Sequence, residues 1–250
     1  MSQKTLVFFT SDVHLGLEVS DAAAREERFV AFLRSIPVEK TQALYLLGDI
    51  WDFWYEYKHV VPKGYFKVFT ALSGLIEAGV DVYFMPGNHD IWTYHYLQSL
   101  GIKVVKERVL FTEHSGKVFC LSHGDGLGRG MWGYKTMRAI FHCRFFQILF
   151  STLHPRIAFG IGRTWSRHNR LAKKQKYQFR GEAEPLYGWA SKITESRKTD
   201  YLICGHFHCS YRAVLPSGTE FSILDSWMDG APYLCFSPKS GLSGSLPNME

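Results

Sequence analysis

Hydrophobic residues in the first hundred positions follow two alternating patterns. Some apolar runs have the length of strands, and other segments carry apolar residues at helical spacing. The strand-length runs fall at 5–11, 43–47 and 80–85, and the helical segments at 20–36 and 65–78. This alternation predicts an α/β fold with at least partly parallel strand pairing. After Gly101, and again from residue 200 to 236, short apolar runs separated by turns predict further strands, some of them antiparallel.

The stretch 126–180 has a different character. Its apolar residues recur at helical spacing, and Pro155 predicts a break between two helices. It holds 12 Lys or Arg and no Asp or Glu, whereas the rest of the chain holds 17 cations and 23 anions. We interpret it as a basic, hydrophobic helical cap inserted into a single domain that spans 1–250. Such a face can bind an anionic partner, or it can simply be solvated.

Composition narrows the class of protein. With 250 residues and 46% hydrophobic residues, the chain is an ordinary globular protein, large enough for one big domain or two small ones. It shows neither a basic leader with a cleavage site nor an apolar run long enough to span a membrane, so we expect a cytoplasmic protein. Its five cysteines have no CxxC spacing, which favours reduced thiols. The segment "CGHFHC", 204–209, therefore interests us for its histidines.

Five short clusters of polar residues each follow a predicted strand. They are Asp12-Val-His14, Gly48-Asp49-Ile-Trp-Asp52, Gly87-Asn88-His89-Asp90, His123-Gly-Asp125 and Gly205-His206-Phe-His208. Each cluster alone is more typical of a turn or a helix cap than of a site. Because the carboxyl ends of strands gather functional groups in α/β sheets, we expect all five to converge.

The residue types in these clusters indicate which metals they suit. Carboxylate, imidazole and amide ligands without thiolate favour Mn, Fe, Co, Zn or Mg over a structural zinc site. A lone carboxylate such as Asp49 can bridge two ions with its two oxygens. Seven protein groups with one of them bridging give each ion four ligands and leave room for water and substrate. The clusters therefore predict a two-metal site that clamps a phosphoryl group.

In this order, the five motifs resemble those of the calcineurin-like metallophosphoesterase superfamily, and the likeness extends from residue 6 to about 236. The resemblance implies a four-layer αββα sandwich with a dinuclear metal site, to which the helical cap would be added. It implies that Asp12, His14 and His208 hold one ion, that Asn88, His123 and His206 hold the other, and that Asp49 bridges them. It also implies attack on phosphorus by a metal-bridging hydroxide. His89 would lie beside the phosphoryl group, oriented by Asp90.

From His123 onward the sequence is similar to one branch, the UDP-2,3-diacylglucosamine hydrolases of lipid A synthesis. This resemblance implies cleavage of the diphosphate to UMP and 2,3-diacylglucosamine 1-phosphate. It also implies a set of substrate-binding residues, which comprises His89, Tyr134, Arg138, Ser166, Arg167, Asn169 and Lys173. The chain departs from well-known members of the branch at His89, where they carry Arg.

The implied partners follow from this substrate. We expect two divalent ions, Mn²⁺ first with Fe, Co, Zn or Mg as alternatives, and a nucleotide-lipid taken from an anionic inner membrane on which the enzyme rests peripherally. We expect no nucleic acid. Two alternatives stay open, namely a metallophosphatase or phosphodiesterase for another nucleotide or nucleic-acid substrate, and a non-catalytic scaffold on the same fold. The apolar cap residues can line an acyl groove or pack the cap onto the core, and these residues are Phe141, Phe145, Phe146, Leu149 and Phe150.

Overall fold

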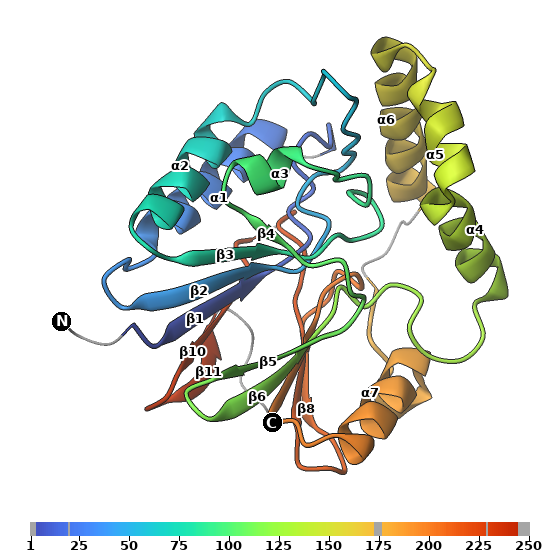
Figure 1. The fold of residues 1–250 in the computed structure, drawn as a ribbon. Coiled ribbons are helices and arrows are strands. Elements are labelled where there is room, and N and C mark those ends of the chain that lie inside the picture. Colours follow the sequence, from blue (N-terminus) through green and yellow to red (C-terminus); the bar gives the residue numbers. More distant parts are fainter. Residues whose placement is uncertain (1–3, 20, 173–176, 229, 245–250) are drawn as a thin grey trace.

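The structure is a computed structural model that describes residues 4–19, 21–172, 177–228 and 230–244, with side chains except at 167 and 169–172. Its described strands form two sheets (Figure 1). The first has the order β11-β10-β1-β2-β3-β4 and the second the order β5-β6-β7-β9-β8. Both sheets have parallel centres; antiparallel strands lie at both edges of the second sheet and at the β10–β11 edge of the first, whose other edge strand, β4, is parallel.

The first sheet contains the strands predicted near the N-terminus. Its parallel strands are β1 (Leu6–Thr10), β2 (Thr41–Leu46), β3 (Asp81–Phe84) and β4 (Lys103–Val104), and its antiparallel strands are β10 (Leu234–Ser237) and β11 (Gly241–Gly244). The second sheet consists of β5 (Leu110–His114), β6 (Lys117–Leu121), β7 (Tyr201–Cys204), β8 (Tyr211–Val214) and β9 (Glu220–Ile223).

Three apolar cores separate four layers. One lies between the first sheet and the helices α1 (Ala22–Ser35) and α2 (Phe66–Glu77), and another between the two sheets. The third lies between the second sheet and α7 (Pro185–Ser196). Strand β1 shows how one sheet contributes to two cores, because successive side chains point to opposite faces. Phe8 faces the first core, while Val7 and Phe9 face the second. The predicted α/β sandwich is therefore confirmed.

The helical stretch differs from the prediction in one respect. The sequence predicts two helices separated at Pro155, and the structure has three, α4 (Trp132–His142), α5 (Arg144–Ser151) and α6 (Pro155–Ala172). The additional break falls at Cys143, whose backbone is extended. Figure 1 shows these helices standing beside the two sheets. They follow β6 in the chain and precede η1 (Gly181–Ala183) and α7, whereas the short α3 (Tyr96–Ser99) precedes β4.

Candidate active site

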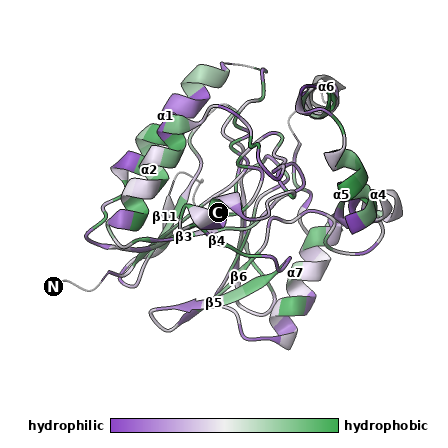
Figure 2. Ribbon diagram, turned by 45° about the horizontal axis from the view of Figure 1, so that its top comes forward, coloured by the Kyte–Doolittle hydropathy of each residue, from purple (hydrophilic) through white to green (hydrophobic). Residues whose placement is uncertain are grey.

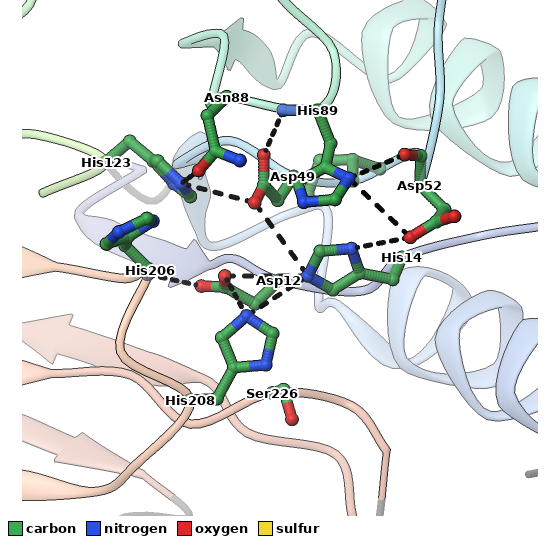
Figure 3. A network of polar contacts seen from close by, with 12 residues as sticks. Asp12, His14, Asp49, Asp52, Asn88, His89, His123, His206, His208 and Ser226 are labelled. Atoms are coloured by element: carbon green, nitrogen blue, oxygen red, sulfur yellow. Dashed lines mark hydrogen bonds and ion pairs between the residues drawn. The ribbon is translucent and has the colours of Figure 1, made fainter. Parts of the chain in front are cut away.

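The five polar clusters converge, as the sequence predicts. They follow β1, β2, β3, β6 and β7, and their side chains meet where these strands end (Figure 3). Three groups of His and acidic residues have ligand atoms within 4.8 Å of one another. The groups are Asp12 with His14, Asp49 and His208; Asp49 with His123 and His206; and His14 with Asp52 and His89. Asp49 belongs to the first two groups, so it lies between them.

The backbone of these loops is unusual. Five of the residues have positive φ, which few non-glycine residues adopt, and they are Asp12, His14, Asp49, His206 and His208. Such conformations cost of order 1–3 kcal/mol each and persist where the surrounding structure holds them, most often at functional sites. The loops are also tightly packed, since a Cβ atom on Gly87 would collide with the Asp49 carboxylate, and one on Gly205 with that of Asp12.

The carboxylates of Asp12 and Asp49 each have one oxygen that accepts a backbone hydrogen bond and one that faces the cluster. Oδ1 of Asp49 accepts the His89 N–H at 2.9 Å, while Oδ2 lies 3.8 Å from Nε2 of His14 and 3.4 Å from Nε2 of His123. Oδ2 of Asp12 accepts the His206 N–H at 2.9 Å, while the buried Oδ1 accepts no hydrogen bond among the described residues. That oxygen lies 3.2 Å from Nε2 of His208. The oxygens that face the cluster are thus oriented for a cation.

The histidines are oriented in the same sense. Nδ1 of His123 donates to the carbonyl of Leu47 at 2.8 Å, so the Nε2 lone pair of the neutral ring is directed at Asp49. Nδ1 of His14 faces Oδ1 of Asp52 at 3.2 Å, and its Nε2 lies 3.2 Å from Nε2 of His208. Outer acceptors of this kind fix the tautomer of metal-binding histidines. Lone pairs and carboxylates gathered without a positive charge repel one another, so the residues present fit bound metal.

Asn88 completes the second group. Its Oδ1 lies 3.4 Å from Nε2 of His123, and it offers a neutral oxygen ligand on the side of Asp49 away from His14 (Figure 3). The described residues therefore place all seven predicted ligands around two adjacent positions that share Asp49. Cys204 and Cys209 are buried in the core beneath the second sheet, and all five cysteines are free thiols.

The electrostatics of the cluster follow from this crowding. Burial acts to raise the pKa of Asp49, but His123, His89 and His14 together lower it more, and the pKa lies well below 3.8. Burial acts to lower the pKa of His123, but the Asp49 carboxylate raises it well above 6.5. Burial and the neighbouring His123 lower the pKa of His206 to about 4. In the absence of metal, a proton on His123 thus supplies part of the missing positive charge.

The residue that orients His89 is not the expected one. The sequence predicts Asp90, but the Asp90 carboxylate is buried and accepts backbone N–H groups of both neighbouring loops, at 2.7 Å from Gly87 and 2.8 Å from Ile50. Burial and the charge of Asp49 raise the pKa of Asp90 to about 7. Nδ1 of His89 instead donates to the backbone oxygen of Asp52 at 2.8 Å. Asp90 therefore ties the loops after β2 and β3 together, and Asp52 positions His89.

A large cavity opens from the cluster toward the helices α4, α5 and α6. Its volume is about 960 Å³. Polar residues line the end near the cluster, and apolar residues of the stretch 137–165 line the rest together with Phe53, Ile91 and Trp92 of the loops after β2 and β3. The apolar set of the stretch 137–165 comprises Met137, Ile140, Phe141, Phe146, Leu149, Phe150, Leu153, Ile161 and Trp165. The sequence left open whether five apolar residues of these helices line a groove or pack onto the core. Four of them line this cavity, namely Phe141, Phe146, Leu149 and Phe150, and the fifth, Phe145, is 68% exposed.

The substrate-binding residues predicted from the sequence lie in different places. Tyr134 and Arg138 line the cavity, and both donate to Oδ2 of Asp125, at 3.1 and 2.8 Å. Ser166 lines it too, but its hydroxyl donates to Asp52. Lys173 and the side chains of Arg167 and Asn169 lie outside the described residues.

Sequence reasoning missed the roles of Asp52 and Asp125. Both stand in the quoted clusters, and each contacts groups that are distant in sequence. Spacing alone could not reveal these contacts. One hint was present in the sequence. Asp52 follows Asp49 and Asp125 follows His123 in their motifs, and the set of seven metal ligands includes neither Asp52 nor Asp125.

Comparison with known proteins defines the class. The model of the calcineurin-like phosphoesterase family matches residues 5–210. The chain therefore belongs to the calcineurin-like phosphoesterase family, and it is a hydrolase of phosphoesters. A dimetal phosphatase from Danio rerio has the same fold, with a TM-score of 0.52 at 13% identity over 97% of this chain and 96% of its own.

Among curated proteins the chain is similar to UDP-2,3-diacylglucosamine hydrolases. That of Porphyromonas gingivalis is 30% identical over 263 residues, which cover 99% of this chain and 100% of the relative. That of Neisseria gonorrhoeae is 32% identical over 203 residues, which cover 80% and 81%. The chain thus matches these relatives over most of their length.

Proposed function

We propose that this protein hydrolyses the diphosphate of UDP-2,3-diacylglucosamine to UMP and 2,3-diacylglucosamine 1-phosphate. The observation that carries the proposal is the cavity, which joins the histidine and carboxylate cluster to an apolar space between the core and α4–α6. A nucleotide-lipid needs both, since its diphosphate requires cations and its acyl chains require an apolar groove. The similarity to hydrolases of that name supports the same substrate.

The residues present would hold two divalent ions. Asp12, His14 and His208 would bind one, Asn88, His123 and His206 the other, and Oδ2 of Asp49 would face both. Oxygen and imidazole ligands without thiolate favour Mn²⁺, with Fe, Co, Zn or Mg as alternatives. When bound, such ions would supply hydroxide near neutral pH and neutralise charge on the phosphoryl oxygens.

His89 is suited to the leaving group. Its ring lines the cavity and is 20% exposed, and its Nδ1 proton is committed to Asp52, so Nε2 is the nitrogen that can exchange a proton with substrate. Burial lowers the pKa of His89. The neutral ring is therefore the main form at neutral pH, and in its protonated form Nε2 would give a proton to the oxygen that leaves phosphorus. No covalent enzyme intermediate is needed.

Arg138 and Tyr134 would bind the substrate phosphates or sugar at the mouth of the cavity. Asp125 holds both side chains in place, and burial of Asp125 acts to raise its pKa, while His123, His206 and Arg138 lower it below 3.8. The carboxylate is thus ionised at neutral pH and keeps the guanidinium fixed beside the cluster. A cation on rigid support favours recognition of an anionic group.

A direct assay tests the proposal. The protein is incubated with UDP-2,3-diacylglucosamine and Mn²⁺, and UMP and the lipid phosphate are measured by mass spectrometry. We expect both products in equal amounts, and chelation of the metal should abolish them. Turnover of a small diester such as bis(p-nitrophenyl) phosphate without any release of UMP would contradict the substrate while leaving the phosphoesterase chemistry intact.

We also propose that the helices α4–α6 rest on an anionic inner membrane from the cytoplasmic side. Helix α5 has no buried residue, and Trp132 and Phe145 are 82% and 68% exposed. Figure 2 colours much of α5 as hydrophobic. Exposed aromatic residues among cations are typical of helices that adsorb to a membrane surface. No helix among the described residues is long and apolar enough to cross a bilayer.

Vesicle binding tests this surface. The double variant Trp132→Ser/Phe145→Ser should bind vesicles of phosphatidylglycerol and phosphatidylethanolamine about tenfold more weakly, because two large apolar side chains no longer enter the interface. Phe66→Ser is a matched control, since Phe66 is 79% exposed and belongs to α2 rather than to α4–α6. Equal binding of the double variant and the wild type, measured by sedimentation, would contradict the proposal.

A further inference from the structure

Helix α6 approaches the core through a face of small residues. Ala158, Gly162 and Ser166 recur every four residues, so they share one face of the helix, and all three are buried. A Cβ atom on Gly162 would collide with the ring of Phe53. Phe53 follows directly on Asp52, in the loop after β2. The helix therefore packs closely against the loop that carries Asp52.

A buried hydrogen bond joins α6 to this loop. The hydroxyl of Ser166, which is 1% exposed, donates to Oδ1 of Asp52 at 2.7 Å. The same oxygen lies 3.2 Å from Nδ1 of His14 and 3.7 Å from Nδ1 of His89. Figure 3 shows both rings directed at this carboxylate. Oδ1 of Asp52 thus faces three groups. They are the hydroxyl of Ser166 on α6, the His14 ring of the loop after β1 and the His89 ring of the loop after β3.

We infer that Ser166 is a positioning residue, which acts through Asp52 on His14 and His89 and so couples the docking of α6 to the geometry of the active site. The inference rests on the proposed metal site. The sequence predicts Ser166 as a substrate ligand, but its proton is already donated within the protein. Removing that donor frees the Asp52 carboxylate to rotate, which moves the oxygen that faces Nδ1 of His14 at 3.2 Å and changes the charge 3.7 Å from Nδ1 of His89. Such outer contacts set the orientation and basicity of metal-binding histidines.

The test compares Ser166→Ala, which removes the donor, with Ser166→Thr, which keeps a hydroxyl. The substrate is bis(p-nitrophenyl) phosphate with Mn²⁺, because this small diester needs the metal centre and not the apolar cavity. For Ser166→Ala we expect kcat to fall about tenfold with KM changed less than about twofold, and Mn²⁺ affinity measured by calorimetry to fall about tenfold. Ser166→Thr should restore most of both. Thr164→Ala, at an exposed position of the same helix, should behave as the wild type.

Two outcomes would overturn the inference. One is a Ser166→Ala variant with normal kcat on the small diester and normal Mn²⁺ affinity, whose only defect is a raised KM for UDP-2,3-diacylglucosamine, as for a substrate ligand. The other concerns the double variant. We expect Ser166→Ala to lower kcat no further when Asp52→Asn is already present, so a full additional loss in the double variant would contradict the inference. Failure of the protein to cleave the nucleotide-lipid leaves these measurements valid, because they use the small diester alone.

Discussion

The two ends of the cavity are held in place in different ways. At the metal end, Asp12, His14, Asp49 and His123 are buried; backbone N–H and carbonyl groups orient Asp12, Asp49 and His123, and the Asp52 carboxylate faces His14. At the other end, α4 and α5 contain no buried residue. Their polar ties to the core include Trp92 Nε1 to the Phe141 oxygen at 3.0 Å and Tyr55 to the Gln147 oxygen at 2.8 Å.

This difference teaches how the two tasks are divided. Phosphoryl chemistry requires fixed positions, and the strained loops after the strands provide them. Binding of flexible acyl chains, as we propose for this protein, would require apolar area more than fixed positions, and the helices α4 and α5 would provide that area. The metal end should therefore govern the rate on every substrate, and the helical end should govern which substrate is used.

The largest expected effect tests the metal end. Asp49→Ala removes the carboxylate shared by both ligand groups. We expect kcat to fall by at least about 1,000-fold on the small diester and on the nucleotide-lipid alike, because neither ion retains a full ligand set. Metal content, measured by plasma mass spectrometry, should fall in parallel. Asp81→Ala, which removes an exposed carboxylate paired with Lys103, should leave both values unchanged. Retained activity in Asp49→Ala would contradict the two-metal site.

The next effect tests the helical end. Leu149 lines the cavity and is 56% exposed, so Leu149→Glu places a charge in the acyl path without disturbing a core. We expect kcat/KM for UDP-2,3-diacylglucosamine to fall about 100-fold, because a carboxylate would have to be desolvated beside an acyl chain. Turnover of the small diester should change less than twofold. Phe66→Glu is the control at an exposed apolar position outside the cavity. Equal losses on both substrates would break the proposed division.

A smaller effect concerns pH. The Asp49 carboxylate raises the pKa of His123 well above 6.5, so in the metal-free protein this ring is protonated at neutral pH. Metal binding must displace that proton. Mn²⁺ affinity should therefore rise with pH through neutrality, by at most about tenfold per pH unit, and calorimetry in two buffers should show proton release. His206, with a pKa of about 4, has no proton to lose in this range. An affinity that is constant between pH 6 and 8 would contradict the displacement of a proton from His123 by the metal.

Sequence reasoning predicted that the candidate ligands converge, which the structure shows, and left the groups that orient them undetermined. Asp12, His14, Asn88 and the others stand in short motifs after strands, and the strand pattern alone implies that they converge. The roles of Asp52, Asp90 and Ser166 depend on which distant groups their side chains meet. Such contacts leave no periodic trace in a single sequence.

The cap illustrates the same limit. Its composition predicts basic, apolar helices, but an apolar residue looks the same in a sequence whether it lines a cavity, as Phe150 does, or is exposed, as Phe145 is. The break at Cys143 carries no proline or glycine to mark it. The helix α7 was not predicted, although Pro185 at its start and buried residues at Leu186, Ala190 and Thr194 give it a helical pattern.

The most direct measurement compares two nucleotide-sugar diphosphates under Mn²⁺. UDP-2,3-diacylglucosamine and UDP-N-acetylglucosamine share the diphosphate and differ in the acyl chains that the cavity would hold. We predict a kcat/KM at least about 100-fold higher for the diacyl substrate, with UMP as a product, since burial of each methylene contributes about 0.8 kcal/mol. Equal values for the two substrates, or a preference for the one without long chains, would contradict the account.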